Sequence, residues 1–337
     1  MSNLLVADVS TVEEELLLGS RPVHVNARTG QVLVNSARGL RVNSLLKEDE
    51  WRQIDADVME AARQPLRALA DLRARGLTKP LGGLGTMISN WYTRSEMTAA
   101  TVSMSGRGAQ RDLPDMKMAG VPVPIFSMEF AIDLRTLLAS RRMGDGLDTT
   151  SAVEATRVVA EATDGIVING NTGIVVNGAT IYGYRTHPDR NTNTAGNYGG
   201  GDWGTLANIV TTVEGMINAA NSDRHYGPFH LYVAQTQYNQ AALKYYDDGS
   251  SDKPIDRILG LPPIAGVTML PQLPDGELLL VSMTRETVEW AEAMDIQVRE
   301  WATPDGMSSV FRVMACGTPR VKSRYGGESG IVHATGA

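Results

Sequence analysis

The sequence has a single cysteine and no long apolar run, and both shortages limit what the chain can be. Cys316 is the only cysteine among 337 residues, which excludes an internal disulfide framework and favours a reducing compartment. No stretch of about 18 apolar residues occurs, so a transmembrane helix is not expected. Residues 13–15 are all glutamate, where a signal peptide would need its apolar segment. The sequence therefore predicts a cytoplasmic product.

Basic residues are fewer than acidic ones. The chain has 31 Lys and Arg against 38 Asp and Glu, a formal net charge of −7, and no basic block stands out. A dedicated nucleic-acid reader is therefore disfavoured, whereas a container for DNA stays compatible, because packaged DNA need not be gripped by its wall. With 42% apolar residues the chain can bury a sizeable core, and its length suggests about two domains.

Metal-ligand patterns are missing as well. Five histidines are spread along the chain, and no two have the i, i+4 spacing of one helix face: His24, His187, His225, His230 and His333. Asp247, Asp248 and Asp252 share a short loop, but they lack the spacing and the distal glutamate of a calcium loop. A solvated loop and ordinary polar contacts explain these residues better, so no metal is expected.

The signatures of nucleotide binding and of nucleophilic catalysis are weak or absent. Gly199, Gly201 and Gly204 match G-x-G-x-x-G ahead of a helix, but a dinucleotide site needs a strand directly before the glycines. Here an Asn- and Thr-rich loop precedes them, and Asp202 would repel phosphate. No G-x-S-x-G elbow occurs, and Cys316 lies in an apolar context typical of a core residue. We expect no cofactor, no catalytic residue and no enzymatic activity.

Two segments have too little apolar surface to form a core of their own. Within residues 1–45, four valines alternate with polar residues in the pattern of an extended arm or hairpin: Val23, Val25, Val32 and Val34. Residues 86–125 form two extended flanks around Gly106 and Gly108, which predicts a long hairpin. The arm is expected to lie on another surface, and the hairpin is expected to project.

The remaining segments predict a mixture of helices and strands. A helix is expected from residues 43–44 to Gly76 with a kink at Pro65, and a second, long helix is expected to start at a capping box over 151–154. Further elements then follow: a strand leading into a short helix over 121–133, a helix over 206–220, a strand at 229–234, a helix at 236–246, strands at 267–270, 278–283, 286–292, 296–302 and 309–315, and a small polar tail at 323–337. The predicted fold class is α+β.

This order of elements resembles the Hong Kong 97-type fold, which tailed-phage major capsid proteins share with encapsulins. The resemblance extends over about residues 45–322 and rests on several loose motifs in the same order. They are LLKEDEWRQID at 45–55, similar to the first helix; VPIFSMEFAID at 123–133 and residues 150–170, similar to the strand after the hairpin and the spine helix; IYGYRTHP at 181–188, similar to the segment before the axial domain; and GPFHLYV at 227–233 and LLLVSM at 278–283, similar to axial-domain strands.

The resemblance implies a division of the chain into named regions. They are an N-terminal arm at 1–45, an N-terminal helix region at 46–85, an extended loop hairpin at 86–125, a peripheral domain at 126–203 with a spine helix at 150–168, an axial α/β domain at 204–295, and return strands to the peripheral domain with a C-terminal tail at 296–337. It also implies contacts between subunits, which we expect from Val23, Val25, Val32, Val34, Trp91, Tyr92, Arg94, Arg107, Arg111, Tyr245, Tyr246, Asp247 and Asp248.

The function implied is that of a structural subunit, the major capsid protein of a tailed bacteriophage. Its copies would form the pentamers and hexamers of an icosahedral virion capsid, assembled in the host cytoplasm with a portal protein and with either a separate scaffolding protein or none. The shell would hold double-stranded DNA without sequence-specific contact and without a membrane. The arm of some 45 residues favours this reading over the alternative, an encapsulin shell around a cargo enzyme, because encapsulins usually begin almost directly with the first helix. A monomeric α/β enzyme is a third hypothesis, and it lacks a convergent set of titratable groups.

Some capsids of this fold join their subunits by an isopeptide bond between a lysine on the extended loop and a late asparagine. Residues 86–115 contain no lysine, Lys79 and Lys117 only flank them, and residues 299–337 contain no asparagine. The resemblance therefore implies a shell without covalent cross-links.

Overall fold

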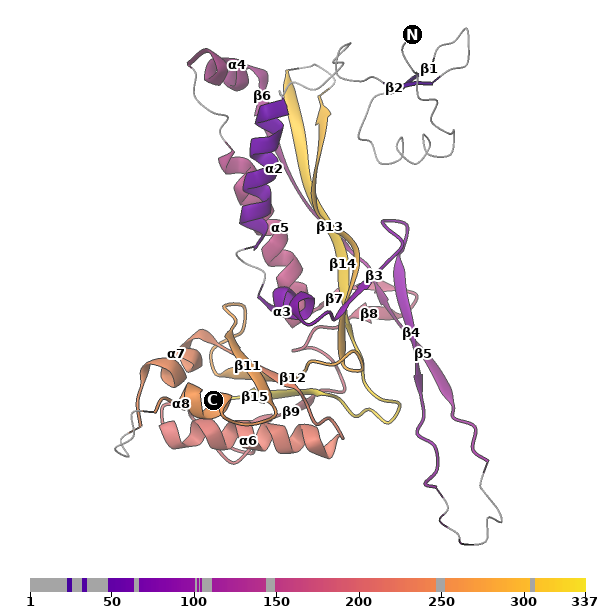
Figure 1. Cartoon of the computed structure of the whole chain (residues 1–337), viewed down its shortest axis with the longest axis vertical. Coiled ribbons are helices and arrows are strands. Elements are labelled where there is room, and N and C mark those ends of the chain that lie inside the picture. Colours follow the sequence, from indigo (N-terminus) through magenta and orange to yellow (C-terminus); the bar gives the residue numbers. More distant parts are fainter. Residues whose placement is uncertain are drawn as a thin grey trace. The chain divides into compact units, whose positions relative to one another are not determined.

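The computed structural model describes residues 23–25, 32–34, 48–63, 67–100, 102, 104, 111–143, 149–246, 252–303 and 307–337 (Figure 1). The chain forms two compact units. The smaller unit contains the short hairpin of β1 (Val23–Val25) and β2 (Val32–Val34), in which Val23 lies opposite Val34, and also α4 (Leu134–Met143). The larger unit holds a five-stranded sheet, most of a four-stranded sheet and the long helix. The mixture of helices and sheets agrees with the predicted α+β class.

The predicted helix over 43–76 is two helices, α2 (Glu48–Arg63) and α3 (Ala68–Ala74). The predicted kink residue, Pro65, lies outside the described residues. Gly76 ends the second helix as expected: its φ is +65°, and its N–H donates to the carbonyl of Arg73 at 3.0 Å. Leu69 and Leu72 bury the apolar face of α3, as their spacing predicts.

The long helix α5 (Thr150–Asn169) forms where the sequence predicts it. The expected capping box is wrong, because the N-cap is Thr149 and no side chain caps the helix. Glu154 instead pairs with Arg157, with 2.5 Å between Oε1 and Nη2. At the other end of α5 the buried Asp164 accepts a hydrogen bond from the backbone N–H of Leu69 at 3.0 Å, which ties the start of α3 to the long helix.

The larger unit contains a five-stranded sheet in the order β11-β10-β12-β15-β9 (Figure 1). Its strands are β9 (Asn191–Thr194), β10 (Phe229–Val233), β11 (Ile264–Met269), β12 (Glu277–Ser282) and β15 (Ile331–Thr335), and the helices of this region are α6 (Leu206–Ser222), α7 (Gln235–Leu243) and α8 (Pro254–Leu259). β10 runs parallel to β11 and antiparallel to β12, and β15 runs parallel to β9.

Both faces of this sheet are covered, so all five residues of β10 are buried. Phe229, Leu231 and Val233 pack with α6, α7 and α8 in one buried cluster. Tyr232, between them on the strand, belongs to a second cluster with residues of α3 and α5 and with Trp290. Because alternate side chains point to opposite faces, a strand covered on both sides lacks the apolar–polar alternation that would signal its orientation, and even its polar residue His230 is buried.

Two expectations about the C-terminal part were wrong. Residues 331–335 are not part of a small polar tail but form β15, and β15 places residues from beyond 204–295 in the same sheet as β10 and β12. The strands expected at 286–292 and 296–302 are one strand, β13 (Val288–Ala302), which lies in a second sheet of order β3-β13-β14-β6. Its other members are β3 (Thr78–Pro80), β6 (Ile125–Asp133) and β14 (Ser308–Val321), which is longer than expected.

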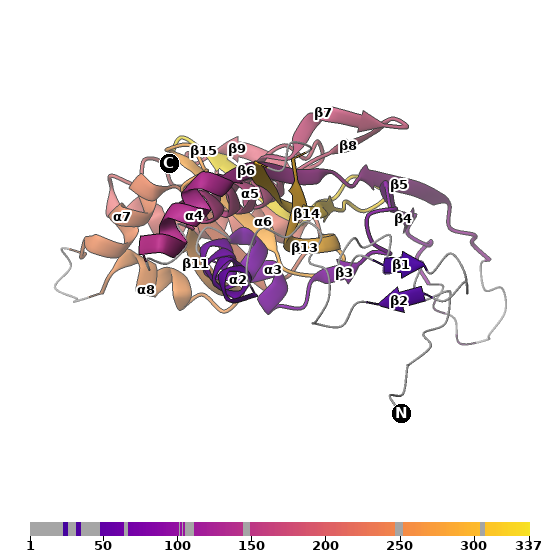
Figure 2. The same ribbon diagram turned by 90° about the horizontal axis from the view of Figure 1, so that it is seen from above.

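The predicted long hairpin is present as β4 (Ile88–Arg94) paired antiparallel with β5 (Met116–Pro122). A short hairpin follows α5, formed by β7 (Asn171–Val176) and β8 (Ala179–Ile181). The views of Figures 1 and 2 both show β7 and β8 next to β5. The two hairpins and residues 319–327 frame the surface considered next.

Candidate assembly surface

The β4–β5 hairpin presents two different faces. Tyr92 lies opposite Met118, and Arg94 lies opposite Met116, so these four side chains share one face. Tyr92, Met118 and Met116 are 65%, 61% and 56% exposed. The structure therefore leaves a row of large apolar side chains in solvent on this face, and no residue of the described chain covers it.

The opposite face fixes the hairpin to the larger unit. Trp91 lies opposite Ala119 and packs against the buried cluster around Trp290. The guanidinium of Arg320, on β14, lies 4.9 Å from the centroid of the Trp91 ring, and its Nη2 donates to the carbonyl of Asn90 at 3.2 Å. Arg320 is 3% exposed, and its Nη1 donates to Glu289 Oε2 at 2.9 Å. This buried cation joins the base of the hairpin to β13 and β14.

Beyond the strands, side chains keep the two flanks together. Asp112 Oδ2 accepts hydrogen bonds from the backbone N–H of Thr98 at 2.7 Å and from its hydroxyl at 2.5 Å. These hydrogen bonds hold the pKa of Asp112 below its ordinary value. Ser95 Oγ accepts from the N–H of Asp115 at 2.8 Å. Of the two predicted contact residues in this part, Arg111 is exposed and Arg107 lies outside the described residues.

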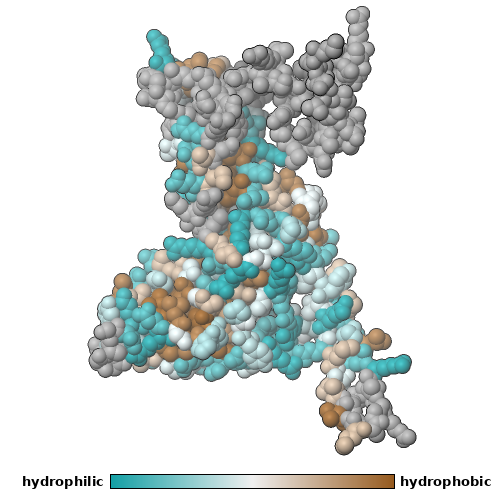
Figure 3. All heavy atoms as spheres, in the orientation of Figure 1, coloured by the Kyte–Doolittle hydropathy of each residue, from teal (hydrophilic) through white to brown (hydrophobic). Residues whose placement is uncertain are grey.

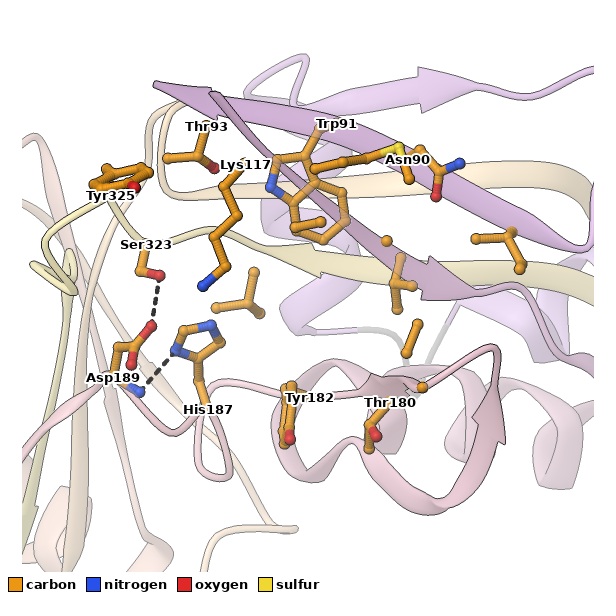
Figure 4. Close-up of a pocket in the computed structure, with 18 of the residues that line it drawn as sticks. Asn90, Trp91, Thr93, Lys117, Thr180, Tyr182, His187, Asp189, Ser323 and Tyr325 are labelled. Atoms are coloured by element: carbon orange, nitrogen blue, oxygen red, sulfur yellow. Dashed lines mark hydrogen bonds between the residues drawn. The ribbon is translucent and has the colours of Figure 1, made fainter. Parts of the chain in front are cut away.

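A groove of about 750 Å³ lies at the base of the hairpin (Figure 4). Trp91 and Lys117 line it from the two strands, and Tyr182 and His187 line it from the segment after β8. Figure 4 shows the Lys117 ammonium pointing toward His187. His187 Nδ1 accepts the N–H of Asp189 at 3.3 Å, and Asp189 Oδ2 accepts the Ser323 hydroxyl at 2.6 Å.

The groove offers polar contacts through these side chains. Burial lowers the pKa of His187, which keeps the imidazole neutral near neutral pH. The loop hydrogen bond expected for this histidine is present. The histidine and the carboxylate of Asp189 are joined through a backbone amide, so they do not form a side-chain relay.

A second predicted contact surface lies between α7 and α8. Tyr245 is 55% exposed, with the Lys253 ammonium 5.3 Å from its ring centroid. Tyr246 is half-buried: Arg257 stacks 3.9 Å from its ring centroid, and its hydroxyl donates to the carbonyl of Leu206 at 3.2 Å. Asp247 and Asp248 lie outside the described residues. Tyr245 is therefore available for contact, whereas Tyr246 is engaged within the chain.

Apolar side chains gather near these tyrosines. Figure 3 shows a hydrophobic patch over the region of α7, α8 and β11. Leu243 and Leu259 are exposed there, at the ends of α7 and α8. For the predicted arm, the structure pairs Val23 with Val34 and Val25 with Val32 across β1 and β2 and describes no side chain of these four.

The chemical sites weighed from the sequence are not assembled in the described structure. Among the described residues, no group of three or more His, Cys, Asp or Glu could hold a metal ion. Cys316 is buried, and burial raises the pKa of its thiol, so the thiolate is disfavoured. The glycine motif packs on α6 instead of forming a phosphate loop: a Cβ on Gly200 would lie 2.6 Å from the carbonyl oxygen of Asn208.

Among the described residues, no helix combines the length and the hydrophobicity that crossing a membrane requires.

Sequence reasoning missed the residues that pair with the predicted ones. Arg320, on β14, contacts Trp91 and is charged, and its neighbours in the sequence do not predict that it is buried. Met116 and Met118 complete the exposed row begun by Tyr92, and their alternation along the return strand was the available signal. Of the predicted hairpin contacts, the structure brings Tyr92 and Arg94 onto the exposed face and turns Trp91 inward.

Comparisons with known proteins agree with this architecture. The sequence profile of a family of unknown function (DUF6260) matches residues 36–334. The type 1 encapsulin shell protein EncA of Myxococcus xanthus (strain DK1622) is 23% identical over 278 residues, which cover 82% of this chain and 90% of that protein.

Solved structures give the same result. A virus-like particle from Pyrococcus furiosus matches with a TM-score of 0.59 and 14% identity, over 84% of this chain and 98% of that one. The capsid of Myoviridae phage XM1 matches with a TM-score of 0.57 and 13% identity, over 93% of this chain and 99% of that one. The predicted Hong Kong 97-type fold is thereby confirmed, and the chain has the fold that capsid and encapsulin-like shell subunits share.

Proposed function

The chain belongs to the DUF6260 family, and from this premise and its capsid-like fold we propose that it is a structural subunit that self-assembles into a closed protein shell. The single observation that carries the proposal is the pairing of this fold with an uncovered apolar row on the hairpin, formed by Tyr92, Met116 and Met118. Transfer of apolar surface from water contributes about 25 cal/mol per Å², so a partner that covers this row gains stability.

Repeated contacts between subunits supply the remaining stability of the shell. A stable contact between proteins usually buries more than about 1,000 Å² in total, and a subunit in a closed shell makes several such contacts at once. The hairpin row and the patch near Tyr245 are two separate surfaces on one chain, as a shell with more than one kind of neighbour requires. Multivalent closure then turns weak single contacts into a stable container.

Within this class, we propose the major capsid protein of a tailed bacteriophage, built as pentamers and hexamers around double-stranded DNA. The phage XM1 capsid aligns with 93% of this chain, and the Pyrococcus particle aligns with 84%. The match to a phage capsid supports this proposal. Separate scaffolding and portal proteins, assembly in the host cytoplasm and a purely structural, non-enzymatic role are part of the same proposal.

An encapsulin-like nanocompartment is the second candidate, and the EncA similarity favours it. That relative is named as a shell protein, and it is matched over 90% of its length. The two candidates differ in content: an encapsulin encloses a cargo protein, whereas a phage capsid encloses a genome.

The test is expression of the full chain alone, followed by size-exclusion chromatography and negative-stain microscopy. Empty or irregular shells that become uniform only with phage partners support the capsid reading. Uniform particles tens of nanometres across that hold a host protein support the encapsulin reading. A single species near 36.3 kDa that stays monomeric at high concentration overturns the shell proposal.

A further inference from the structure

A separate cluster of cations surrounds a pocket of about 500 Å³ between β3, β13 and the end of β14. Four basic side chains line it against one carboxylate: Lys79, Arg285, Arg320 and Lys322, with Glu289. In a chain whose net charge is −7, this local excess of positive charge runs against the overall balance. We refer to these five residues as the basic pocket.

Two of the cations are held in place by the one carboxylate. Glu289 Oε2 accepts from Arg320 Nη1 at 2.9 Å and from Lys322 Nζ at 2.6 Å. The Lys322 ammonium also donates to the carbonyl of Arg285 at 2.6 Å. Both cations are therefore fixed in position before any ligand arrives, which lowers the entropy cost of binding.

The other two cations, Arg285 and Lys79, are not paired with a carboxylate in the described structure. Arg285 Nη2 donates to the carbonyl of Gly76 at 3.2 Å, and within the described residues neither Arg285 nor Lys79 pairs with a carboxylate. Lys79 lies beside Ala291 in the register of β3 and β13, which puts it on the same face of the sheet as Glu289. The positive charges of Arg285 and Lys79 add to those of Arg320 and Lys322. Glu289 is the one carboxylate that lines the pocket beside these four cations.

The closely spaced positive charges in the pocket affect the pKa of one of its lysines. The pKa of Lys322 is lowered, first by burial and further by the nearby charges of Arg320 and Lys79, although Glu289 acts in the opposite direction. The Nε of Arg320 is buried without a hydrogen-bond partner in the described structure. Like charges held this close favour a bound anion, because an anion relieves their repulsion.

We propose that the basic pocket binds a compact oxyanion of the phosphate class. A phosphate group carries about 1.5 to 2 negative charges at neutral pH and offers several strong acceptor oxygens, which matches several cations better than one carboxylate does. The fork of Arg285 can bind two of these oxygens, and Lys79 supplies a point charge beside it. The concave shape fits a single small anion better than it fits a long polymer.

The test is isothermal titration of the purified full chain with inorganic phosphate and with pyrophosphate, against sodium chloride of equal ionic strength. We expect saturable binding of one anion per chain and a rise in the unfolding midpoint beyond that given by chloride. The double variant Lys79→Gln/Arg285→Gln should bind at least tenfold more weakly, because it removes the two uncompensated cations. Both side chains are exposed, so the variant should fold.

The matched control is Lys244→Gln, which removes an exposed cation outside the pocket and should bind as wild type does. An equal effect of chloride, or undiminished binding by the double variant, overturns the proposal. Binding of short duplex DNA without binding of free phosphate also overturns the proposal. Loss of assembly in the double variant overturns it too if the wild-type chain binds no phosphate. That result would assign the pocket to a carboxylate of a second copy. Binding is measured per chain, so the result does not depend on shell formation.

Discussion

The guanidinium of Arg320 lies 4.9 Å from the centre of the Trp91 ring, and this contact joins the base of the long hairpin to the interior of the larger unit. Arg320 is buried and anchored by Glu289, so it provides a fixed platform for the tryptophan. Tyr92, the next residue, points to the other face of the same strand. Trp91 therefore packs the hairpin against the larger unit, whereas Tyr92 is available for contact with a partner.

Replacement of Trp91 by alanine should lower the free energy of unfolding. The cation–π contact alone contributes about 0.5–2 kcal/mol, and the lost packing against the core adds to it. Guanidinium denaturation followed by the fluorescence of the remaining tryptophans measures the change. Tyr92→Ala is the matched control, since its side chain is largely exposed, and its unfolding free energy should stay within about 0.5 kcal/mol of wild type. Equal loss in both variants would contradict the assignment of faces.

Replacing side chains of the exposed apolar row should affect assembly and leave stability unchanged. The double variant Tyr92→Ser/Met118→Ser should fold with wild-type stability and form fewer particles, because the apolar area available for burial at the contact is reduced. Sedimentation velocity at several concentrations measures the fraction assembled. Met59→Ser, at an exposed methionine on α2, is the control and should assemble normally. Normal assembly of the double variant would show that this face is not a contact between subunits.

The sequence could predict elements with a strong local period or a strong boundary signal. The helix α5 and the strands β10 and β12 have continuous or periodic apolar residues, and Gly76 provides a clear helix stop. The order of these elements was enough to indicate the fold. The hairpin flanks followed from similar local evidence, the extended segments around Gly106 and Gly108, whereas the role of Tyr92 as a subunit contact stays a prediction.

Features that depend on distant partners could not be predicted in this way. β15 is a five-residue segment whose place is set by pairing with β12 and β9, and β9 itself reads NTNT, with no apolar alternation. The burial of Arg320 depends on Trp91 and Glu289, which are distant in sequence. The expected capping box failed because α5 begins earlier than the motif: Thr149 is the N-cap, so Ser151 lies inside the helix, and Glu154 pairs with Arg157 instead.

Gly317 should tolerate no side chain. A Cβ at this position would lie 2.4 Å from Cζ2 of Trp290 and 3.1 Å from the carbonyl oxygen of Ala291. Trp290 is buried and has little room to move, so Gly317→Ala should cost about 1–3 kcal/mol of unfolding free energy. Gly85→Ala is the control, because nothing lies within 4 Å of its added Cβ. Chemical denaturation of both variants makes the comparison, and equal stability would contradict the packing described.

Asp164 should make stability depend on pH. Burial raises its pKa to about 6 from an ordinary value of 3.8, the nearby charge of Asp71 adds to the rise, and backbone N–H groups of residues 67–69 oppose it. Between these pH values the folded chain binds more protons than the unfolded chain. The contribution of Asp164 to stability is therefore present below about pH 4 and is lost as the pH rises through 6. The loss is on the order of 2–3 kcal/mol.

The variant Asp164→Asn removes this titration while keeping an acceptor oxygen for the N–H of Leu69. Its unfolding free energy should therefore change less between pH 4 and pH 6 than that of wild type, as measured by denaturation at each pH. Glu161→Gln, at a side chain 43% exposed on the same helix, is the matched control for the removal of a carboxylate from α5. An unchanged slope in Asp164→Asn would assign the pH dependence to other groups.

Assembled particles should contain no covalent bond between subunits. An isopeptide bond forms when a lysine amine attacks an asparagine carboxamide and releases ammonia, and residues 86–115 offer no lysine, while residues 299–337 offer no asparagine. The nearest lysine on the return strand, Lys117, lies opposite Thr93 and lines the groove at the hairpin base. Particles boiled in detergent should therefore run as one band near 36.3 kDa on a denaturing gel. A ladder of covalent oligomers would contradict this, and mass spectrometry of its peptides would show whether Lys117 forms the link.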